Sequence, residues 1–229
     1  MTDVTGLTVG VLGGTGPQGR GLALRWAQAG IAVVVGSRSA DRAEAAAAEL
    51  RAAAGLADAE DRVRGLDNAG CAAAADVVLV AVPWEGHGEL LTALREQLAG
   101  KIVIDCVNPL GFDERGPFAL SVEEGSAAQQ AERLLPESRV TAAFHHVSAV
   151  HLVDPAVTEL DTDVMVLGDD RAATDQVRAL ADVIPGMRGV YAGRLRNAGQ
   201  VEALTANLIA INRRYKAHAG LRVTDVFDR

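Results

Sequence analysis

The feature that most restricts the fold of this chain is a glycine-rich segment that follows a short apolar run. Residues 7–12 read LTVGVL, and Gly14 to Gly19 then match the pattern G-x-G-x-x-G just before a helical pattern begins. A strand, a glycine turn and a helix in this order are typical of dinucleotide-binding proteins, because the turn brings a pyrophosphate to the N-terminus of the helix. Gly14 would permit the tight turn, Gly16 the close approach of the phosphates, and Gly19 the close packing of the helix on the strand.

Alternating apolar runs and helical patterns extend this signal over the first half of the chain. The apolar runs at residues 31–35, 76–82 and 101–105 are continuous, which indicates parallel strands covered by helices on both faces. A helix is predicted over residues 87–98, and turn residues predict a loop over 108–117. The predicted class is therefore α/β, with a Rossmann-type doubly wound parallel sheet.

The rhythm changes in the second half, where the chain is predicted to form a small C-terminal α/β domain. Strand-like residues 163–167 precede helical patterns at 170–183 and 195–219. We therefore expect a dinucleotide-binding domain over residues 1–150 and a smaller domain over residues 151–229 that packs against it.

The residues after the second apolar run indicate which dinucleotide would bind. NAD sites usually carry Asp or Glu there, about 20 residues after the glycines, to hold the ribose 2′-hydroxyl. This chain instead has Gly36-Ser37-Arg38, followed by Arg42 one helical turn later. A hydroxyl and two guanidinium groups would bind a 2′-phosphate through charge-assisted hydrogen bonds, whereas a carboxylate would repel it. The pattern favours NADP over NAD.

Composition and charge argue against several other classes of protein. The 229 residues include 22 Lys and Arg against 30 Asp and Glu, a net charge of −8. Nucleic acid is not an expected partner, because phosphate binding needs a basic face. No apolar run approaches the roughly 20 residues that span a bilayer, and the first residues lack the pattern of a secretion signal. We expect no membrane partner and a cytoplasmic location. Cys71 and Cys106 are expected to be buried free thiols.

Candidate substrate-binding residues follow other apolar runs, at the sheet edge where ligands of such folds bind. Trp84 would either wall a planar ligand or cap the core. His145 and His146 would point to opposite faces of a strand, and no Cys or carboxylate stands at ligand spacing, so no metal is expected. One of these histidines would hydrogen-bond a cofactor or a carbonyl oxygen. The chain shows no nucleophile–base pattern, which suits hydride transfer, because proximity and orientation supply most of the acceleration.

Four blocks of sequence together resemble one family. They are Gly13-Gly14-Thr15-Gly16, Val35-Gly36-Ser37-Arg38, Pro83-Trp84-Glu85 and Ala143-Phe144-His145. The chain is similar over nearly its whole length to the NADPH-dependent coenzyme F420 reductases, or F420H2:NADP oxidoreductases. This resemblance implies reversible hydride transfer between carbon 4 of the nicotinamide and carbon 5 of the deazaflavin, with NADP and coenzyme F420 as small-molecule partners.

The resemblance also implies roles for individual residues. The residues at the pyrophosphate would be Thr15, Gly16, Pro17 and Gln18, and those at the 2′-phosphate would be Ser37, Arg38 and Arg42. The residues near the nicotinamide would be Val82, Trp84 and Ala149. His145 and Val147, the expected catalytic pair, would pack at the deazaflavin and hold the two rings face to face. Thr205 and Asn108 would contact the deazaflavin from the other side. The family also implies a homodimer, with the C-terminal region contributing to the deazaflavin cleft and to the dimer interface.

Two alternatives stay open at the level of sequence. An NADPH-dependent reductase of an imine or carbonyl metabolite, such as a pyrroline-carboxylate reductase, would need a proton donor beside its substrate. It would also need a large helical dimerisation domain, which this short C-terminal part scarcely supplies. A non-catalytic NADP-binding sensor would bind NADPH and transfer no hydride.

Overall fold

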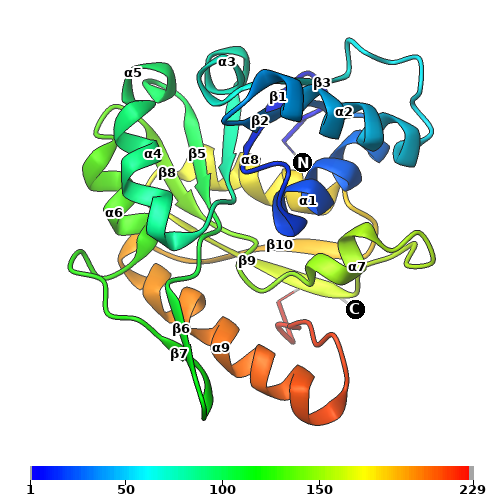
Figure 1. Cartoon of the computed structure of the whole chain (residues 1–229). Coiled ribbons are helices and arrows are strands. Elements are labelled where there is room, and N and C mark those ends of the chain that lie inside the picture. Colours follow the sequence, from blue (N-terminus) through cyan, green and yellow to red (C-terminus); the bar gives the residue numbers. More distant parts are fainter. Residues whose placement is uncertain (1, 227–229) are drawn as a thin grey trace.

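A computed structural model of the chain describes residues 2–226 and places eight strands in one sheet, in the order β10-β9-β8-β5-β4-β1-β2-β3 (Figure 1). The strands of this sheet are β1 (Thr8–Leu12), β2 (Ala32–Ser37), β3 (Val63–Asp67), β4 (Val77–Val80), β5 (Ile102–Asp105), β8 (Arg139–Ala142), β9 (Thr162–Gly168) and β10 (Met187–Gly193). Strands β1 to β5 and β8 run parallel to one another, as the continuous apolar runs predict. The Rossmann-type α/β class is therefore confirmed.

The C-terminal strands join the same sheet with reversed direction. Strand β9 pairs antiparallel with β8, and β10 pairs parallel with β9. The predicted boundary near residue 150 falls between β8 and β9, which are hydrogen-bonded neighbours. A division into domains 1–150 and 151–229 therefore stays a prediction, because the sheet continues across it.

Helices cover both faces of the sheet and create two apolar layers. One layer lies under α1 (Pro17–Gln28), α2 (Ala40–Ala54) and α8 (Arg171–Asp182). The other lies under α3 (Asn68–Ala74), α4 (His87–Ala93), α5 (Arg95–Leu98), α6 (Ala127–Leu134) and the first turns of α9 (Ala198–Tyr215). Cys71 and Cys106 are buried free thiols, as predicted. Within the described residues, no helix combines the length and apolarity that crossing a membrane requires.

The strand order reverses at β1, and this reversal positions the site. Strand β1 pairs with β2 on one side and β4 on the other, so that Gly10 lies between Val34 and Val78. The connection after β1 leads to α1 on one face, and the connection after its neighbour β4 leads to α4 on the other face. Because neighbouring connections diverge here, a crevice opens beyond the carboxyl ends of the strands.

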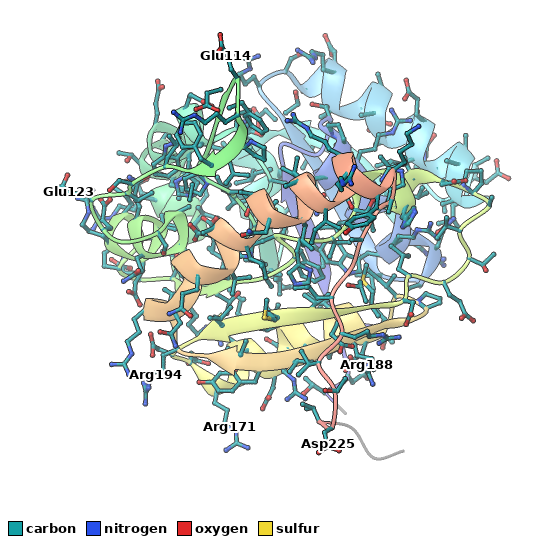
Figure 2. All side chains as sticks on the ribbon, turned by 90° about the horizontal axis from the view of Figure 1, so that it is seen from below. Glu114, Glu123, Arg171, Arg188, Arg194 and Asp225 are labelled. Atoms are coloured by element: carbon teal, nitrogen blue, oxygen red, sulfur yellow. The ribbon has the colours of Figure 1, made fainter. Side chains whose placement is uncertain are left out.

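The loop predicted over residues 108–117 contains a hairpin instead. Strands β6 (Leu110–Asp113) and β7 (Gly116–Ala119) pair antiparallel in a separate two-stranded sheet. The hairpin and α9 lie together away from the main sheet (Figure 1). Figure 2, seen from below, shows α9 crossing the molecule between the hairpin tip at Glu114 and the strands near Arg188. The C-terminal part therefore places α9 beside the hairpin.

Other local differences from the predicted elements have physical causes. The helix predicted over residues 87–98 divides at Leu94 into α4 and α5, after a short 3-10 turn, η1 (Trp84–Gly86). Strand β10 and the five-residue helix α7 (Ala149–Val153) were not predicted. The helix predicted over residues 195–219 begins with another 3-10 turn, η2 (Leu195–Asn197), and continues as α9, which ends at Tyr215. Short elements carry little periodicity, and tertiary packing decides their form.

Gly65 provides a test of the packing of β3 against α2. A β-carbon at Gly65 would lie 2.1 Å from the carbonyl carbon of Ala43 and 2.2 Å from the amide nitrogen of Glu44. These backbone atoms cannot rotate away, so we expect Gly65→Ala to lower the free energy of unfolding by about 1–3 kcal/mol, as over-packing usually does. Urea-induced unfolding measures this change. Gly6→Ala is the matched control, because no atom lies within 4 Å of its β-carbon position; equal losses in both variants would contradict the prediction.

Candidate functional site

The glycine-rich turn joins β1 to α1 at the strand-order reversal. Gly13 has a φ of 77°, and a β-carbon there would lie 2.3 Å from the carbonyl oxygen of Ala81, so this turn requires glycine. Gly16 caps α1, and among residues 2–226 no side chain caps the first turn of that helix with a hydrogen bond. The first N–H groups of α1 are therefore available to an anion, and the helix dipole favours one.

A cleft of about 460 Å³ opens beside this turn. Six of the residues that line it are predicted site residues: Thr15, Gly16, Ser37, Arg38, Arg42 and Val82. Ser37 is buried at the end of β2, while Arg38 and Arg42 are exposed. The lining residues that the structure describes include no Asp or Glu. The fold thus brings the glycine turn and the Ser-Arg segment to one cationic cleft.

Asn68 also lines the cleft, and the sequence patterns did not single it out. It is the first residue of α3, directly after β3. Its Oδ1 atom is buried without a hydrogen-bond partner among the described residues and would lie 3.1 Å from a β-carbon at Gly36. An unpaired buried acceptor usually marks a missing partner. The sequence feature that could have identified Asn68 was its position directly after β3, at the carboxyl end of the strand next to β2.

Three other predicted residues meet at the loop that follows β8. The Nδ2 group of Asn108 donates a hydrogen bond of 2.9 Å to the carbonyl oxygen of His145. The hydroxyl of Thr205 lies 3.2 Å from the same carbonyl oxygen and 3.3 Å from Oδ1 of Asn108. Asn108 follows β5 and Thr205 lies on α9, so segments far apart in the sequence hold the backbone at His145.

The same loop is tied to the glycine turn and carries backbone strain. The side-chain amide of Gln18 donates a hydrogen bond of 3.1 Å to the carbonyl oxygen of Phe144. Phe144 is fully buried with a φ of 66°, a left-handed conformation that costs a non-glycine residue about 1–3 kcal/mol. Its ring packs edge-to-face on Trp26, with 5.6 Å between centroids. Strain held in place by packing is often found at functional sites.

The His145 side chain is buried and electrically neutral. Burial lowers its pKa to about 4, and the charge of Asp105 offsets this only in part. Neither ring nitrogen has a hydrogen-bond partner among residues 2–226. His146 is equally buried, also lacks partners, and has its pKa lowered to about 4 by burial. Among the described side chains, no group of three or more His, Cys, Asp or Glu residues could hold a metal ion.

The remaining predicted residues lie around these two centres rather than in the cleft. Pro17 is exposed at the first position of α1, where its missing N–H is tolerated. Trp84 is half-buried in η1, and its ring packs against the ring of His87 with 5.5 Å between centroids. Val147 is buried in the loop after β8, and Ala149 begins α7. Their predicted roles stay predictions.

Comparisons with known proteins agree on one family. Residues 8–109 match the model of a family described as NADP oxidoreductase, coenzyme F420-dependent. The chain is 39% identical to an F420-dependent NADP reductase of Methanothermobacter thermautotrophicus, over 99% of this chain and 98% of that protein. A crystal structure of a candidate F420-dependent NADP reductase from Arthrobacter sp. FB24 aligns with a TM-score of 0.79 and 29% identity, covering 96% of this chain and 100% of that one. Pyrroline carboxylate reductase of Plasmodium falciparum aligns with a TM-score of 0.60 at 12% identity, covering 93% and 67% of the two chains, which shows a shared fold alone.

Arg38 provides a test of the cationic cleft. We expect Arg38→Asp to weaken NADPH binding more than NADH binding, because a charge-assisted hydrogen bond contributes about 1.5–3 kcal/mol. Titration of the protein with each nucleotide, followed by fluorescence or calorimetry, gives the two dissociation constants. Arg62→Asp is the control, since Arg62 is exposed and lies outside the cleft. Equal losses for NADPH and NADH in Arg38→Asp would show that Arg38 does not distinguish them.

Proposed function

The chain belongs to the coenzyme F420-dependent NADP oxidoreductase family, and from this premise we propose that it transfers a hydride reversibly between NADPH and coenzyme F420. The observation that carries the proposal is the adjacency of two centres. A cationic cleft without acidic lining lies beside a buried loop whose neutral His145 has no hydrogen-bond partner among the described residues. Gln18 connects the two centres, because it lies in the first turn of α1 and its side-chain amide donates a hydrogen bond to the carbonyl oxygen of Phe144.

The cleft fits the phosphates of NADP. Thr15, Gly16 and the free N–H groups at the start of α1 would bind the pyrophosphate. Ser37, Arg38 and Arg42 would bind the 2′-phosphate. Arg42 lies in the first turn of α2, where a cation is unfavourable unless an anion is bound nearby. Pro17 would shape the turn, and Gln18 would hold the turn against the loop rather than contact phosphate.

The loop after β8 would contact the deazaflavin ring. In this proposal, hydride passes between carbon 4 of the nicotinamide and carbon 5 of the deazaflavin, and reduction of the deazaflavin also takes up one proton from solvent at a ring nitrogen. Val82 and Ala149 would flank the nicotinamide, and Trp84 would border it from η1. The unpartnered nitrogens of His145 would hydrogen-bond the deazaflavin, and Val147 would limit how far the rings can separate. Asn108 and Thr205 would fix the His145 backbone and border the ring from α9.

Neutral His145 also bears on the two alternatives. Reduction of an imine or carbonyl metabolite needs a proton donor beside the substrate. Burial lowers the pKa of His145 to about 4, so its ring is neutral at neutral pH and would be a weak proton donor to an imine or carbonyl substrate. A non-catalytic sensor would leave the arrangement at His145 without a purpose. In the proposed reaction the protein would act mainly by holding the two rings in the correct relative orientation, which can supply most of the acceleration.

The decisive experiment combines purified protein with NADPH and oxidised coenzyme F420 and follows the visible absorbance of the deazaflavin. We expect loss of that absorbance, slower with NADH because Arg38 and Arg42 would have no 2′-phosphate to bind. Reduction of an imine or carbonyl substrate with no change in F420 would favour the metabolite reductase. NADPH binding without any hydride transfer would favour the sensor.

We further propose that the protein is a cytoplasmic homodimer that associates through α9 and the hairpin. Four apolar side chains are exposed there: Phe112 at 61%, Phe118 at 45%, Ile211 at 40% and Tyr215 at 73%. Exposed apolar patches of this kind are typical of interaction surfaces. Light scattering is expected to give the mass of two chains, and Phe112→Glu with Tyr215→Glu to give one. A monomeric wild-type protein would overturn this assembly.

A further inference from the structure

A group of polar side chains lies buried between β5, α4, α6 and α9, outside the cleft. His87 begins α4 and is fully buried. Its Nε2 atom lies 2.6 Å from Oδ2 of Asp105, and its Nδ1 atom lies 3.0 Å from Oε1 of Gln130. A buried ion pair gains little stability over apolar side chains of similar size, because both charges lose their hydration. Its presence therefore calls for a reason other than stability.

The hydrogen-bond partners favour a protonated His87. Gln130 places its amide nitrogen 3.4 Å from a carboxylate oxygen of Glu124, so its oxygen faces the histidine ring. Both ring nitrogens of His87 then face acceptors, an arrangement that favours a proton on each nitrogen. Burial acts to lower the pKa of His87, but the charge of Asp105 and the hydrogen bonds to Asp105 and Gln130 outweigh it and raise the pKa.

Glu202 adds a second titratable group to this cluster. Its carboxylate oxygens accept hydrogen bonds of 2.9 and 3.1 Å from the backbone N–H groups of Ala127 and Ala128, at the start of α6. The side chain is 3% exposed, and burial raises its pKa to about 7 against the lowering effect of those two bonds. The cluster is therefore neutral overall when Glu202 is protonated and gains one negative charge when it ionises near neutral pH.

Two connections lead from His87 and Asp105 to predicted ring-contacting residues. The ring of Trp84 packs against the ring of His87 at 32°, an arrangement in which a cation attracts the indole face. The other carboxylate oxygen of Asp105 accepts a 3.0 Å hydrogen bond from the amide of Val107, which precedes Asn108. His87 and Asp105 therefore connect Trp84 in η1 with Asn108, whose side chain holds the carbonyl oxygen of His145.

A third connection runs along α9. Glu202 and Thr205 are three residues apart on this helix and so lie on neighbouring parts of one face. Glu202 joins the helix to α6, and Thr205 bonds to the loop at His145. Movement of Glu202 would displace Thr205 with it.

We propose that His87, Asp105 and Glu202 form the positioning unit of this site, which holds Trp84, Asn108 and Thr205 for hydride transfer and makes its rate sensitive to pH. This inference rests on the proposed function and deepens it. These residues act through others and touch no substrate. Ionisation of Glu202 adds a second carboxylate charge to the one on Asp105, and repulsion between these buried charges favours rearrangement.

The other charged groups around the cluster lie at its margin. Glu124 and Arg133 form an ion pair on the side of α6. Cys106 and His145 lie beside Asp105, and neither carries charge at neutral pH, because burial raises the pKa of the thiol and lowers that of the imidazole. The remaining charged residues on elements packed against α4, α6 and α9 are exposed: Glu85, Glu89, Arg95, Glu96, Asp113, Glu132, Arg139, Arg196, Arg213 and Arg214.

The first test compares pH profiles of the F420–NADPH reaction. We expect the wild-type kcat to fall as pH rises through about 7, and Glu202→Gln to remove that fall because its side chain cannot ionise. The ratio of the two rates at each pH cancels any titration of the substrates themselves. Thr92→Ala is the control, since Thr92 is exposed on α4 one turn after the cluster. A constant ratio between Glu202→Gln and wild type would overturn the pH role.

The second test separates positioning from folding. We expect His87→Gln to lower kcat by about 10- to 100-fold, as small displacements of reacting groups can, while the dissociation constant for NADPH changes much less than kcat. If this variant does not fold, nitrogen NMR of wild-type His87 still tests the cluster, and both ring nitrogens are expected to be protonated at neutral pH. The Trp84 fluorescence, obtained by subtracting the Trp84→Phe spectrum, is expected to rise when His87 loses its proton.

The outcomes distinguish the two proposals. A wild-type protein that fails to reduce F420 would refute the proposed function, and NMR and fluorescence would still report the charge of His87. Normal F420 reduction by wild type together with full kcat in His87→Gln would refute the positioning role. A neutral His87 ring at neutral pH would also refute it.

Discussion

The pairing of β1 with both β2 and β4 is the constraint on which the rest of the molecule depends. It reverses the strand order at one point and leaves a crevice beyond the carboxyl ends. The turn after β1 must then pass within van der Waals distance of Ala81, which only Gly13 permits. From this point the chain supplies free helix N–H groups, and β2 delivers Arg38 to the same cleft. The conformation of the glycine turn and the position of Arg38 in the cleft thus both follow from the pairing of β1 with β2 and β4.

The second centre is made by contacts between distant segments. Gln18, Asn108 and Thr205 come from a helix start, a strand end and the last helix, and all bond to the backbone at residues 144–145. These bonds hold Phe144 in a conformation that its side chain disfavours. A reaction governed by orientation needs such a rigid loop, because a displacement of 1 Å can cost about 100-fold in rate.

Predictions from sequence succeeded where a signal is local and repeated. The glycine turn, the Ser-Arg segment and the long apolar strands are all where the patterns place them, within one or two residues. They failed where elements are short. The hairpin of β6 and β7 contains Gly and Pro and resembles a loop, and β10 mixes Met, Arg and Tyr without clear alternation. The two hairpin strands pair only with each other, and β10 pairs with β9, so the neighbouring strand rather than the residue pattern makes each segment a strand.

The sequence by itself determined the α/β class and the cationic residues that line the cleft beside the glycine turn, because both depend on neighbouring residues and on chemical type. Only the tertiary structure decided that Asn68 joins the cleft, that His145 is buried and neutral, and that His87 meets Asp105 and Gln130. Burial and hydrogen bonding set the charge of a histidine, and both arise from residues that the chain brings together only when it folds.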